Sequence, residues 1–405
     1  SIMGVTRIRD IASILGKTQA ANPSNPALGT GTGAGLDSAD VLNLTGDFAK
    51  SNRNMIVNGG MDISQRGTSG FTVGAAVNYG IDMFSTYKDQ TSATFAYTKE
   101  FLDSAETGSL APRQAGITQY AKITNTGTDA SLGATDRMIF VHRIEGRRMA
   151  HLLWGSPNAK NAKLSFYVNS SVTGTHGGAI GNGNDTRSYP FTYTINSADT
   201  WERKEVTITG DTAHDYKWTN AFTNDRGAQV VFGLGVGSTY STTAGAWANG
   251  DYNSATGATA GVMSTSSATW KITGLQFEAG DTMTPFEFRD RDEVFKDCLR
   301  YFWRVTRNDT YGEFLPVIRC YSTSNGTGVT LFPEPMRSDP TMAISATVSS
   351  SNFGYALSSI SIGNSDVNHT QCEFFAAGSF TANGAAVIQK ANNTDAVSID
   401  FDASM

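Results

Sequence analysis

The sequence predicts an all-β fold: an antiparallel jelly-roll-like β-sandwich followed by a second, smaller β-sandwich, with a short helical and linker segment at the N-terminus. Gly is abundant (42 of 405 residues), charged residues make up only 17% and aromatic residues 10%, which suits many short strands joined by tight turns. Alternating apolar and polar runs recur, without the long helices that parallel crossovers need. The length exceeds the roughly 250–300 residues that one core usually serves, so more than one domain is expected.

Residues 1–53 differ from the rest and are predicted to form an N-terminal attachment segment. Apolar residues from Ile8 to Leu15 recur at helical spacing, and residues 22–35 are a Pro- and Gly-rich linker. Residues 38–50 carry a second, narrow apolar stripe. A helix this short is marginal by itself, so we expect it to need a partner chain or a docking surface.

Residues 54–289 are predicted to form the larger, carbohydrate-binding-like jelly-roll domain. Alternation places every second residue of a strand on one buried face. The apolar positions of the predicted strands are Phe95 and Tyr97; Leu164, Phe166 and Val168; Phe191, Tyr193 and Ile195; and Val230, Phe232, Leu234 and Val236. The interior helical candidate, residues 147–154, is expected to cap one end of the sandwich.

Residues 290–405 are predicted to form a linker helix and a C-terminal β-sandwich tip domain. Either Asp290 or Asp292 can cap a helix whose apolar stripe runs from Val294 through Leu299 to Phe302. The strands predicted beyond it cover residues 312–321, 327–332, 341–348, 371–377 and 396–401.

Charge and hydropathy exclude several classes of partner. Acidic residues (37) exceed basic ones (31), and no run of Lys or Arg is longer than two residues, so no nucleic acid is expected as a partner. No apolar run approaches the roughly 18 residues that span a bilayer, so membrane insertion is not expected. The N-terminus lacks a basic region followed by a hydrophobic one, so a signal peptide is not expected either.

No complete motif for binding a cofactor occurs in the sequence. Gly16, Lys17 and Thr18 resemble part of a phosphate-binding loop, but Ile11 stands where that motif needs its first glycine. Cys298, Cys320 and Cys372 are odd in number and lack CxxC spacing, which disfavours disulfides and zinc. We expect three small buried apolar residues and no cofactor.

Catalytic groups are sought among His, Asp and Glu. The five histidines are scattered, and no serine-hydrolase elbow or H-E-x-x-H motif occurs. A glycosidase needs two carboxylates about 5–10 Å apart, and Asp62, Asp82, Glu145 and Glu278 are the candidates. Since such carboxylates more often bond local backbone or face water, we expect no enzyme.

Aromatic residues in loops are the candidate ligand-binding residues. Trp218, Tyr240, Trp247 and Tyr252 lie in or beside Gly-, Ser- and Asn-rich segments, where flat rings can stack on sugar faces. The alternative, which we favour because Trp is usually mostly buried, is that these rings plug the open ends of the sandwich.

Six segments in order resemble the β-sandwich of bacteriophage tail-fibre and receptor-binding proteins. They are residues 54–67 (NMIVNGGMDISQRG), 143–155, 162–175, 201–211, 245–257 and 272–289 (ITGLQFEAGDTMTPFEFR). These sandwiches are jelly-roll-like and similar to carbohydrate-binding modules. Residues 296–302, 332–345 and 398–404 are similar to fibre tips.

The resemblance implies a virion structural protein without catalytic residues, located on the phage particle surface as a tail or head fibre. It further implies a homotrimer held to other virion proteins through residues 1–53, with its distal domains facing a host-surface glycan. The chain lacks the heptads of a long fibre shaft, which leaves tail or head mounting open. Jelly-roll modules often hold a structural Ca²⁺, and the sequence does not determine whether this one does. A capsid or tail decoration protein and a glycan depolymerase are the alternatives.

Overall fold

The computed structural model describes residues 53–213, 217–307, 318–344, 348–350, 357–376, 380–382, 384–386, 388–390 and 397–405. The chain divides into two compact units after Arg53, and all of the description below concerns the second, Asn54–Met405. The helices predicted before residue 53, and the Gly16-Lys17-Thr18 sequence, lie outside the described residues.

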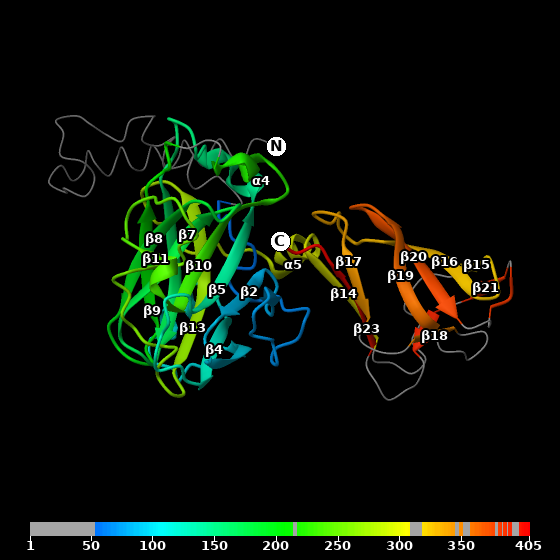
Figure 1. The fold of residues 1–405 in the computed structure, drawn as a ribbon, viewed down its shortest axis with the longest axis horizontal. Coiled ribbons are helices and arrows are strands. Elements are labelled where there is room, and N and C mark those ends of the chain that lie inside the picture. The colour runs from blue at the N-terminus through cyan, green and yellow to red at the C-terminus, as the bar shows by residue number, and fades with distance from the viewer. Residues whose placement is uncertain are drawn as a thin grey trace, which may run out of the picture. The chain divides into compact units, whose positions relative to one another are not determined.

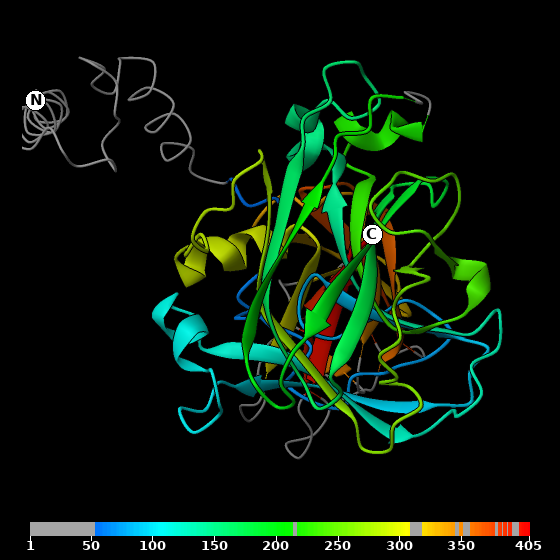
Figure 2. The ribbon, with the colours of Figure 1, turned by 90° about the vertical axis from the view of Figure 1, so that its left-hand side faces the viewer.

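Two antiparallel sheets form the larger sandwich (Figures 1 and 2). The six-stranded sheet has the order β1 (Asn78–Tyr79), β2 (Phe84–Asp89), β5 (Arg137–Glu145), β10 (Arg226–Val236), β7 (Gly174–Asn182) and β8 (Ser188–Ile195). The five-stranded sheet has the order β3 (Thr94–Phe101), β4 (Gln119–Gly127), β13 (Thr269–Ala279), β6 (Ala162–Ser170) and β9 (Glu202–Ile208). A short parallel pair, β11 (Ser241–Thr242) and β12 (Ser254–Ala255), lies in the long connection between β10 and β13. The predicted antiparallel jelly-roll-like sandwich is therefore confirmed.

The core between the two sheets is aromatic. Phe232 of β10 pairs with Phe140 of β5, and the ring of Trp270 from β13 lies 5.5 Å from each of them. Phe166 of β6 is fully buried and lies 5.0 Å from Phe232. Since edge-to-face pairs add to the burial of rings of this size, these contacts join the two sheets.

The predicted alternation holds on most strands and fails at one point. Leu164, Phe166 and Val168 are all fully buried, as expected. The stripe predicted on β10 extended to Val236, but the register shifts between Gly233 and Gly235. Such a bulge reverses the sides that later residues face, and Val236 packs with Ile139 and Val141 on the opposite face of the sheet.

Helices are few and short in the described residues. The helical candidate at residues 147–154 is confirmed as α4 (Gly146–Met149) followed by the 3₁₀ turn η2 (Ala150–Leu152). The helix α3 (Leu110–Gln114) and the 3₁₀ turns η4 (Thr219–Phe222) and η5 (Ser238–Tyr240) were not predicted.

The predicted linker helix is α5 (Arg291–Leu299). Asp290 is its N-cap, and its side chain accepts a hydrogen bond from the backbone N–H of Asp292. The prediction was wrong for Phe302, because the chain turns at Tyr301 and Phe302 begins a strand. The domain boundary between residues 289 and 290 stays a prediction.

The C-terminal part forms the second, smaller sandwich. One sheet has the order β14 (Phe302–Arg307), β23 (Val397–Asp402) and β17 (Thr341–Ile344). The other has the order β19 (Leu357–Ser365), β20 (His369–Ala376), β16 (Asn325–Leu331), β15 (Ile318–Cys320) and β21 (Ala385–Ala386), and β18 (Val348–Ser350) pairs with β22 (Ile388–Lys390). Ile399 and Phe401 of the first sheet share a core with Ile318, Cys372 and Phe374 of the second. The strands β14, β19, β21 and β22 were not predicted. Of the strand predicted at residues 312–321, the part before residue 318 lies outside the described residues.

Candidate functional site

A hollow of about 160 Å³ lies on the face of the six-stranded sheet that points away from the aromatic core. We call it the sheet hollow. Its lining residues are Val77, Tyr87, Arg137, Ile139, Val141, Arg143, Asp185, Arg226, Gln229, Asp251 and Asn253.

Strand alternation builds the floor of the sheet hollow. On β5, Met138 and Phe140 belong to the inner core, so Ile139 and Val141 point to the other face, where they form an apolar cluster with Val231. An apolar floor with polar groups around it is the usual composition of a ligand site.

Arg137 is fixed at the rim of the sheet hollow. Its guanidinium lies 3.9 Å from the ring centroid of Tyr240 and 4.8 Å from that of Tyr87. Its Nη1 donates to Asp251 Oδ2 at 2.7 Å and to Asn253 Oδ1 at 3.0 Å. Its Nε has no hydrogen-bond partner within the described part of the chain. Two rings, the carboxylate of Asp251 and the carboxamide of Asn253 thus hold the guanidinium in one orientation.

A second set of polar side chains, from β10 and the β7–β8 turn, also lines the sheet hollow. Arg226 Nη2 donates to Asp185 Oδ2 at 2.6 Å, and Gln229 Nε2 donates to Asp185 Oδ1 at 2.8 Å. Arg143 Nη1 donates to the hydroxyl oxygen of Tyr79 at 3.1 Å and to that of Ser85 at 3.3 Å. The charged side chains of the sheet hollow are therefore fixed by hydrogen bonds within the protein.

The four aromatic residues selected from the sequence separate into two places. Tyr240 lies on Arg137 at the sheet hollow, and Tyr252, half-buried, is flanked in sequence by Asp251 and Asn253 of its lining. Trp218 and Trp247 meet each other instead, with centroids 5.4 Å apart.

The tryptophan cluster packs against the sandwich core. Trp154 contacts Trp218 at 5.1 Å and Trp247 at 5.2 Å, and Trp218 is only 3% exposed. The Nε1 of Trp218 donates to the buried Asp211 at 2.9 Å. Trp218 therefore has no free ring face for a sugar in this conformation, whereas Trp247 is half-buried. That any of the four residues contacts a glycan stays a prediction.

Three of the four candidate carboxylates for catalysis accept hydrogen bonds from neighbouring side chains. Asp82 is buried, which raises its pKa, and it accepts from both the backbone and the side chain of Gln65. Glu145 accepts from Tyr301 Oη at 2.7 Å. Glu278 accepts from Gln276 Nε2 at 2.9 Å. Burial also raises the pKa of Asp62.

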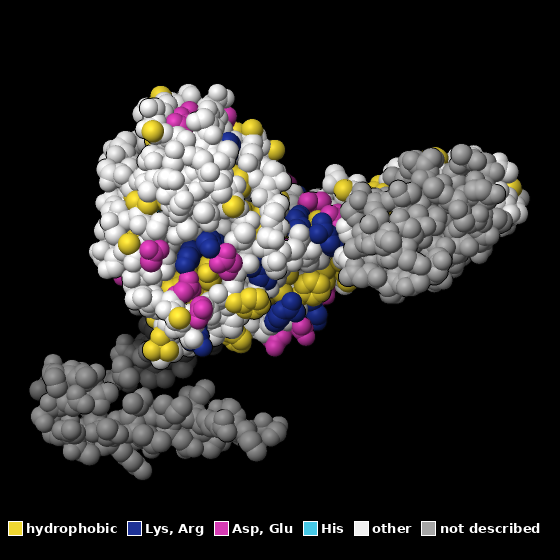
Figure 3. All heavy atoms as spheres, turned by 90° about the horizontal axis from the view of Figure 1, so that it is seen from below, with side chains coloured by type: hydrophobic (Ala, Val, Ile, Leu, Met, Phe, Trp, Pro, Cys, Tyr) yellow, Lys and Arg dark blue, Asp and Glu magenta, His cyan; other side chains and the backbone are white. Residues whose placement is uncertain are grey.

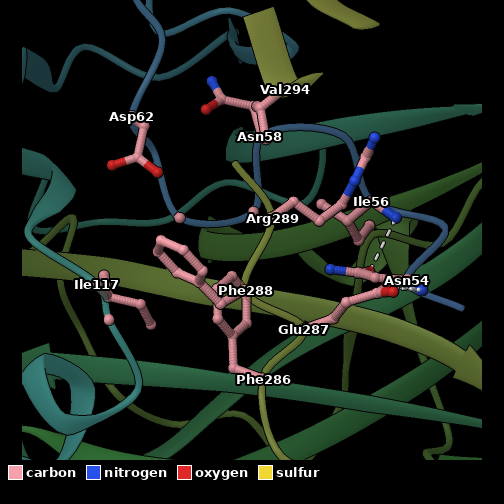
Figure 4. A pocket seen from close by; sticks show the side chains of 13 residues that line it. Asn54, Ile56, Asn58, Asp62, Ile117, Phe286, Glu287, Phe288, Arg289 and Val294 are labelled. Carbon is pink, nitrogen blue, oxygen red and sulfur yellow. Dashed lines mark hydrogen bonds between the residues drawn. The ribbon is translucent and has the colours of Figure 1, made fainter. Parts of the chain in front are cut away.

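Asp62 lines a second, much smaller cavity, with room of about 20 Å³ (Figure 4). It lies where residues 54–62 meet the segment from Phe286 to Arg289, and the backbone N–H of Asn54 donates to Glu287 Oε2 at 2.8 Å. A cavity of this size holds about one water molecule, so it reflects how the opening and closing segments pack together.

Other kinds of site find little support in the described residues. Within these ranges no group of three or more His, Cys, Asp or Glu side chains comes together that could hold a metal ion. No described helix combines the length and the apolar content needed to cross a membrane. On the face shown in Figure 3, most of the described surface is uncharged, and positive and negative side chains lie in mixed clusters. Cys298, Cys320 and Cys372 are free and buried, as predicted.

No protein-family model matches the chain, and no curated protein matches it. Among solved structures, the enzymatically active domain of bacteriophage CBA120 tailspike protein 4 aligns with a TM-score of 0.28 and 9% identity, over 57% of this chain and 22% of that chain. A family 11 carbohydrate-binding module of a Clostridium thermocellum cellulase aligns with a TM-score of 0.25 and 12% identity, over 54% of this chain and 99% of the module. The module TmCBM61, in complex with β-1,4-galactotriose, aligns with a TM-score of 0.25 and 7% identity, over 57% of this chain and 99% of the module. At such TM-scores these similarities carry no argument about fold or ligand.

Sequence reasoning missed most of the sheet hollow. Tyr87, Arg137, Asp185 and Gln229 lie on four different strands or turns, and only their register brings them together. One signal was available: on β5 the outward positions read Arg137, Ile139, Val141 and Arg143, which is an apolar pair between two arginines.

Proposed function

We propose that this chain is a phage virion structural protein, a fibre that recognises a host-surface glycan through the sheet hollow without cleaving it. The observation that carries the proposal is Arg137, held between the rings of Tyr87 and Tyr240 and tied to Asp251 above an apolar floor. The order of fibre-like segments along the sequence supports the virion role. Attachment through residues 1–53 and assembly as a homotrimer belong to the same proposal.

The balance of charges in the sheet hollow favours a polyhydroxyl ligand over a strongly anionic one. Asp251 pairs with Arg137 and Asp185 with Arg226, which leaves the single positive charge of Arg143, bound to the hydroxyls of Tyr79 and Ser85, and several donors and acceptors. Sugar hydroxyls both donate and accept, and the apolar face of a sugar ring can lie on the half-buried ring of Tyr87. The hollow is smaller than the roughly 300–1,000 Å³ that encloses a drug-sized ligand, so we expect it to hold one ring of a longer glycan.

We expect a site of this size to bind a glycan weakly, and we expect the several copies of the chain on one particle to compensate for the low affinity of each. A millimolar dissociation constant corresponds to about −4 kcal/mol. Several copies on one particle can raise the apparent affinity by about 10²–10⁴ without any new contact. Host attachment therefore does not need a deep pocket in each chain.

The test is binding of the purified chain to a glycan array and, fluorescently labelled, to host cells. Tyr87→Ala removes one of the two rings that hold Arg137, and we expect at least a tenfold loss of affinity, about 1.4 kcal/mol. Phe101→Ala is the matched control, because Phe101 is a 72% exposed aromatic residue on the other sheet. Equal binding by wild type and Tyr87→Ala would remove the sheet hollow from the proposal.

The same experiment separates the alternatives. Retention on virions with no binding to host cells would favour a capsid or tail decoration protein. Release of reducing ends from host polysaccharide would favour a depolymerase. The partners of Asp82, Glu145 and Glu278 give each of these carboxylates a structural role, which supports binding without catalysis.

A further inference from the structure

The C-terminal sandwich exposes an apolar stripe on the central strand of its five-stranded sheet. Leu331 of β16 is 74% exposed and Val329 is 52% exposed, and Tyr321, just after β15, is 43% exposed. The alternate residues of these strands, such as Ile318 and Cys320, face the buried core. We call the outward side of β15, β16 and β20 the β16 face (Figure 1).

Opposite charges flank this stripe. The register pairs Arg319 of β15 with Thr327 of β16, and Thr327 with Glu373 of β20. Residues paired across neighbouring strands point to the same side of a sheet, so Arg319 and Glu373 lie on the β16 face, one strand to either side of the stripe. In the described residues neither side chain forms an ion pair or a side-chain hydrogen bond, and Arg319 is exposed.

We infer that the β16 face packs against the same face of further copies of this chain. A two-fold axis running along β16 places Leu331 over its own counterpart and Arg319 opposite Glu373 of the other copy, twice. A three-fold axis gathers Val329 and Leu331 around the axis and again sets Arg319 beside Glu373 of its neighbour. Self-complementary surfaces of this kind are what closed, symmetric oligomers need.

The arrangement fits a second copy better than an unrelated protein. An apolar centre with a positive flank and a negative flank supplies its own complement, whereas a different partner would have to present the mirrored charges. The inference does not depend on glycan recognition. It rests on the self-assembly of the proposed function and deepens it by naming the surface that joins the copies. A trimer that gives no cross-link through Val329→Cys would overturn the β16 face and leave the trimer standing. A cross-linked dimer would overturn the trimer and leave the β16 face standing, and a monomer that binds glycan would overturn assembly alone.

The first test is the mass of the full chain in solution, measured by light scattering after size exclusion. We expect a dimer or trimer for wild type and a monomer for Leu331→Lys, because three or two ammonium groups would meet at the axis. Leu110→Lys is the control, since Leu110 is 63% exposed on α3 in the larger sandwich. We expect this control to keep the wild-type mass.

The second test exchanges charges. Arg319→Glu and Glu373→Arg should each weaken association at least tenfold, because like charges would then meet at every contact. Mixing the two variants should restore association. Arg319→Glu carries acidic groups at both positions and Glu373→Arg carries basic groups at both, so opposite charges meet again where the two variants contact each other. Full recovery indicates a dimer and partial recovery a trimer, in which one of three contacts stays mismatched.

A third measurement, chemical cross-linking, distinguishes assembly through the β16 face from assembly through another region of the chain. The native cysteines are buried, so a short bismaleimide should react in Val329→Cys only at the introduced thiol and join neighbouring copies. Phe222→Cys, also exposed, is the control and should give no such product. A monomeric wild type, or no cross-link through Val329→Cys, would overturn the inference.

Discussion

Tyr301 Oη donates a hydrogen bond to Glu145 Oε2 at 2.7 Å, and this contact ties the end of α5 to the end of β5. Glu145 is 3% exposed and also accepts from Arg300 Nη2 at 3.1 Å. A buried carboxylate is stable only when donors replace its water. Two consecutive residues between the helix and β14 therefore satisfy a carboxylate of the larger sandwich.

Tyr301→Phe should destabilise the protein by about 1.5–3 kcal/mol, the usual range for a hydrogen bond to a charged group. Phenylalanine keeps the ring and its packing, so the change reports the hydroxyl alone. Urea unfolding at neutral pH measures this loss of stability, with Tyr252→Phe as the control because Tyr252 is half-buried and its hydroxyl has no hydrogen-bond partner in the described residues. A shift no larger than the control's would mean that Glu145 is satisfied without Tyr301.

Leu299→Ala should cost about 2–5 kcal/mol, because Leu299 on α5 is only 5% exposed. Phe295 also belongs to the apolar stripe predicted for this helix but is only half-buried, so Phe295→Ala should cost less. Lys296→Ala, at an exposed position of the same helix, should change stability by under about 0.5 kcal/mol. Equal effects for Leu299→Ala and Lys296→Ala in thermal unfolding would contradict the packing of α5.

Asp211→Ala should cost about 3–5 kcal/mol, because it leaves a buried guanidinium without its counter-charge. Arg187 binds Asp211 through Nε at 2.9 Å and Nη2 at 2.8 Å, and the two side chains are 9% and 2% exposed. Trp218 also loses a hydrogen bond, so its fluorescence should report the change. The half-buried pair of Asp185 and Arg226 provides the comparison, because both side chains keep access to water. Asp185→Ala should therefore cost less than Asp211→Ala, about 1 kcal/mol.

The features that could be predicted from the sequence are local ones. Leu164, Phe166 and Val168 reveal a buried strand because the period of two is written in consecutive residues. Asp290 is recognisable as a cap because a helix N-terminus needs an acceptor at that position. The bulge at Gly233 and Gly235, by contrast, has no signature in the alternation before it, so Val236 was placed on the wrong face.

The sheet hollow could not be predicted because its parts meet only through register. Tyr87, Arg137 and Asp251 are brought together by pairing between β2 and β5 and by the return of the connection after β11. Tyr240 was selected as an aromatic residue in a loop, but its contact with Arg137 depends on the path of that connection. Burial of Trp218 likewise follows from Trp154 and Asp211, which no local pattern links to it.

His142 should make the stability of the protein fall as the pH is lowered. Its Nε2–H donates to the carbonyl oxygen of Val57 at 3.1 Å, while its buried Nδ1 has no partner in the described residues. Burial, with smaller effects from the charges of Arg148 and Arg143, lowers the pKa of His142 to about 3 from the ordinary 6.5. Below pH 6.5 the unfolded chain therefore takes up a proton that the folded chain does not accept until about pH 3.

Between those two pH values this one group should reduce the free energy of unfolding by up to about 1.4 kcal/mol for each unit of pH decrease. His142→Gln keeps an N–H donor for Val57 and does not titrate, so its stability should depend less steeply on pH. Urea unfolding of both proteins from neutral to mildly acidic pH measures the difference. Asp82, whose raised pKa acts in the opposite sense, is present in both and cancels. Parallel curves for the two proteins would show that His142 is protonated in the folded state and that its surroundings are more polar than this packing allows.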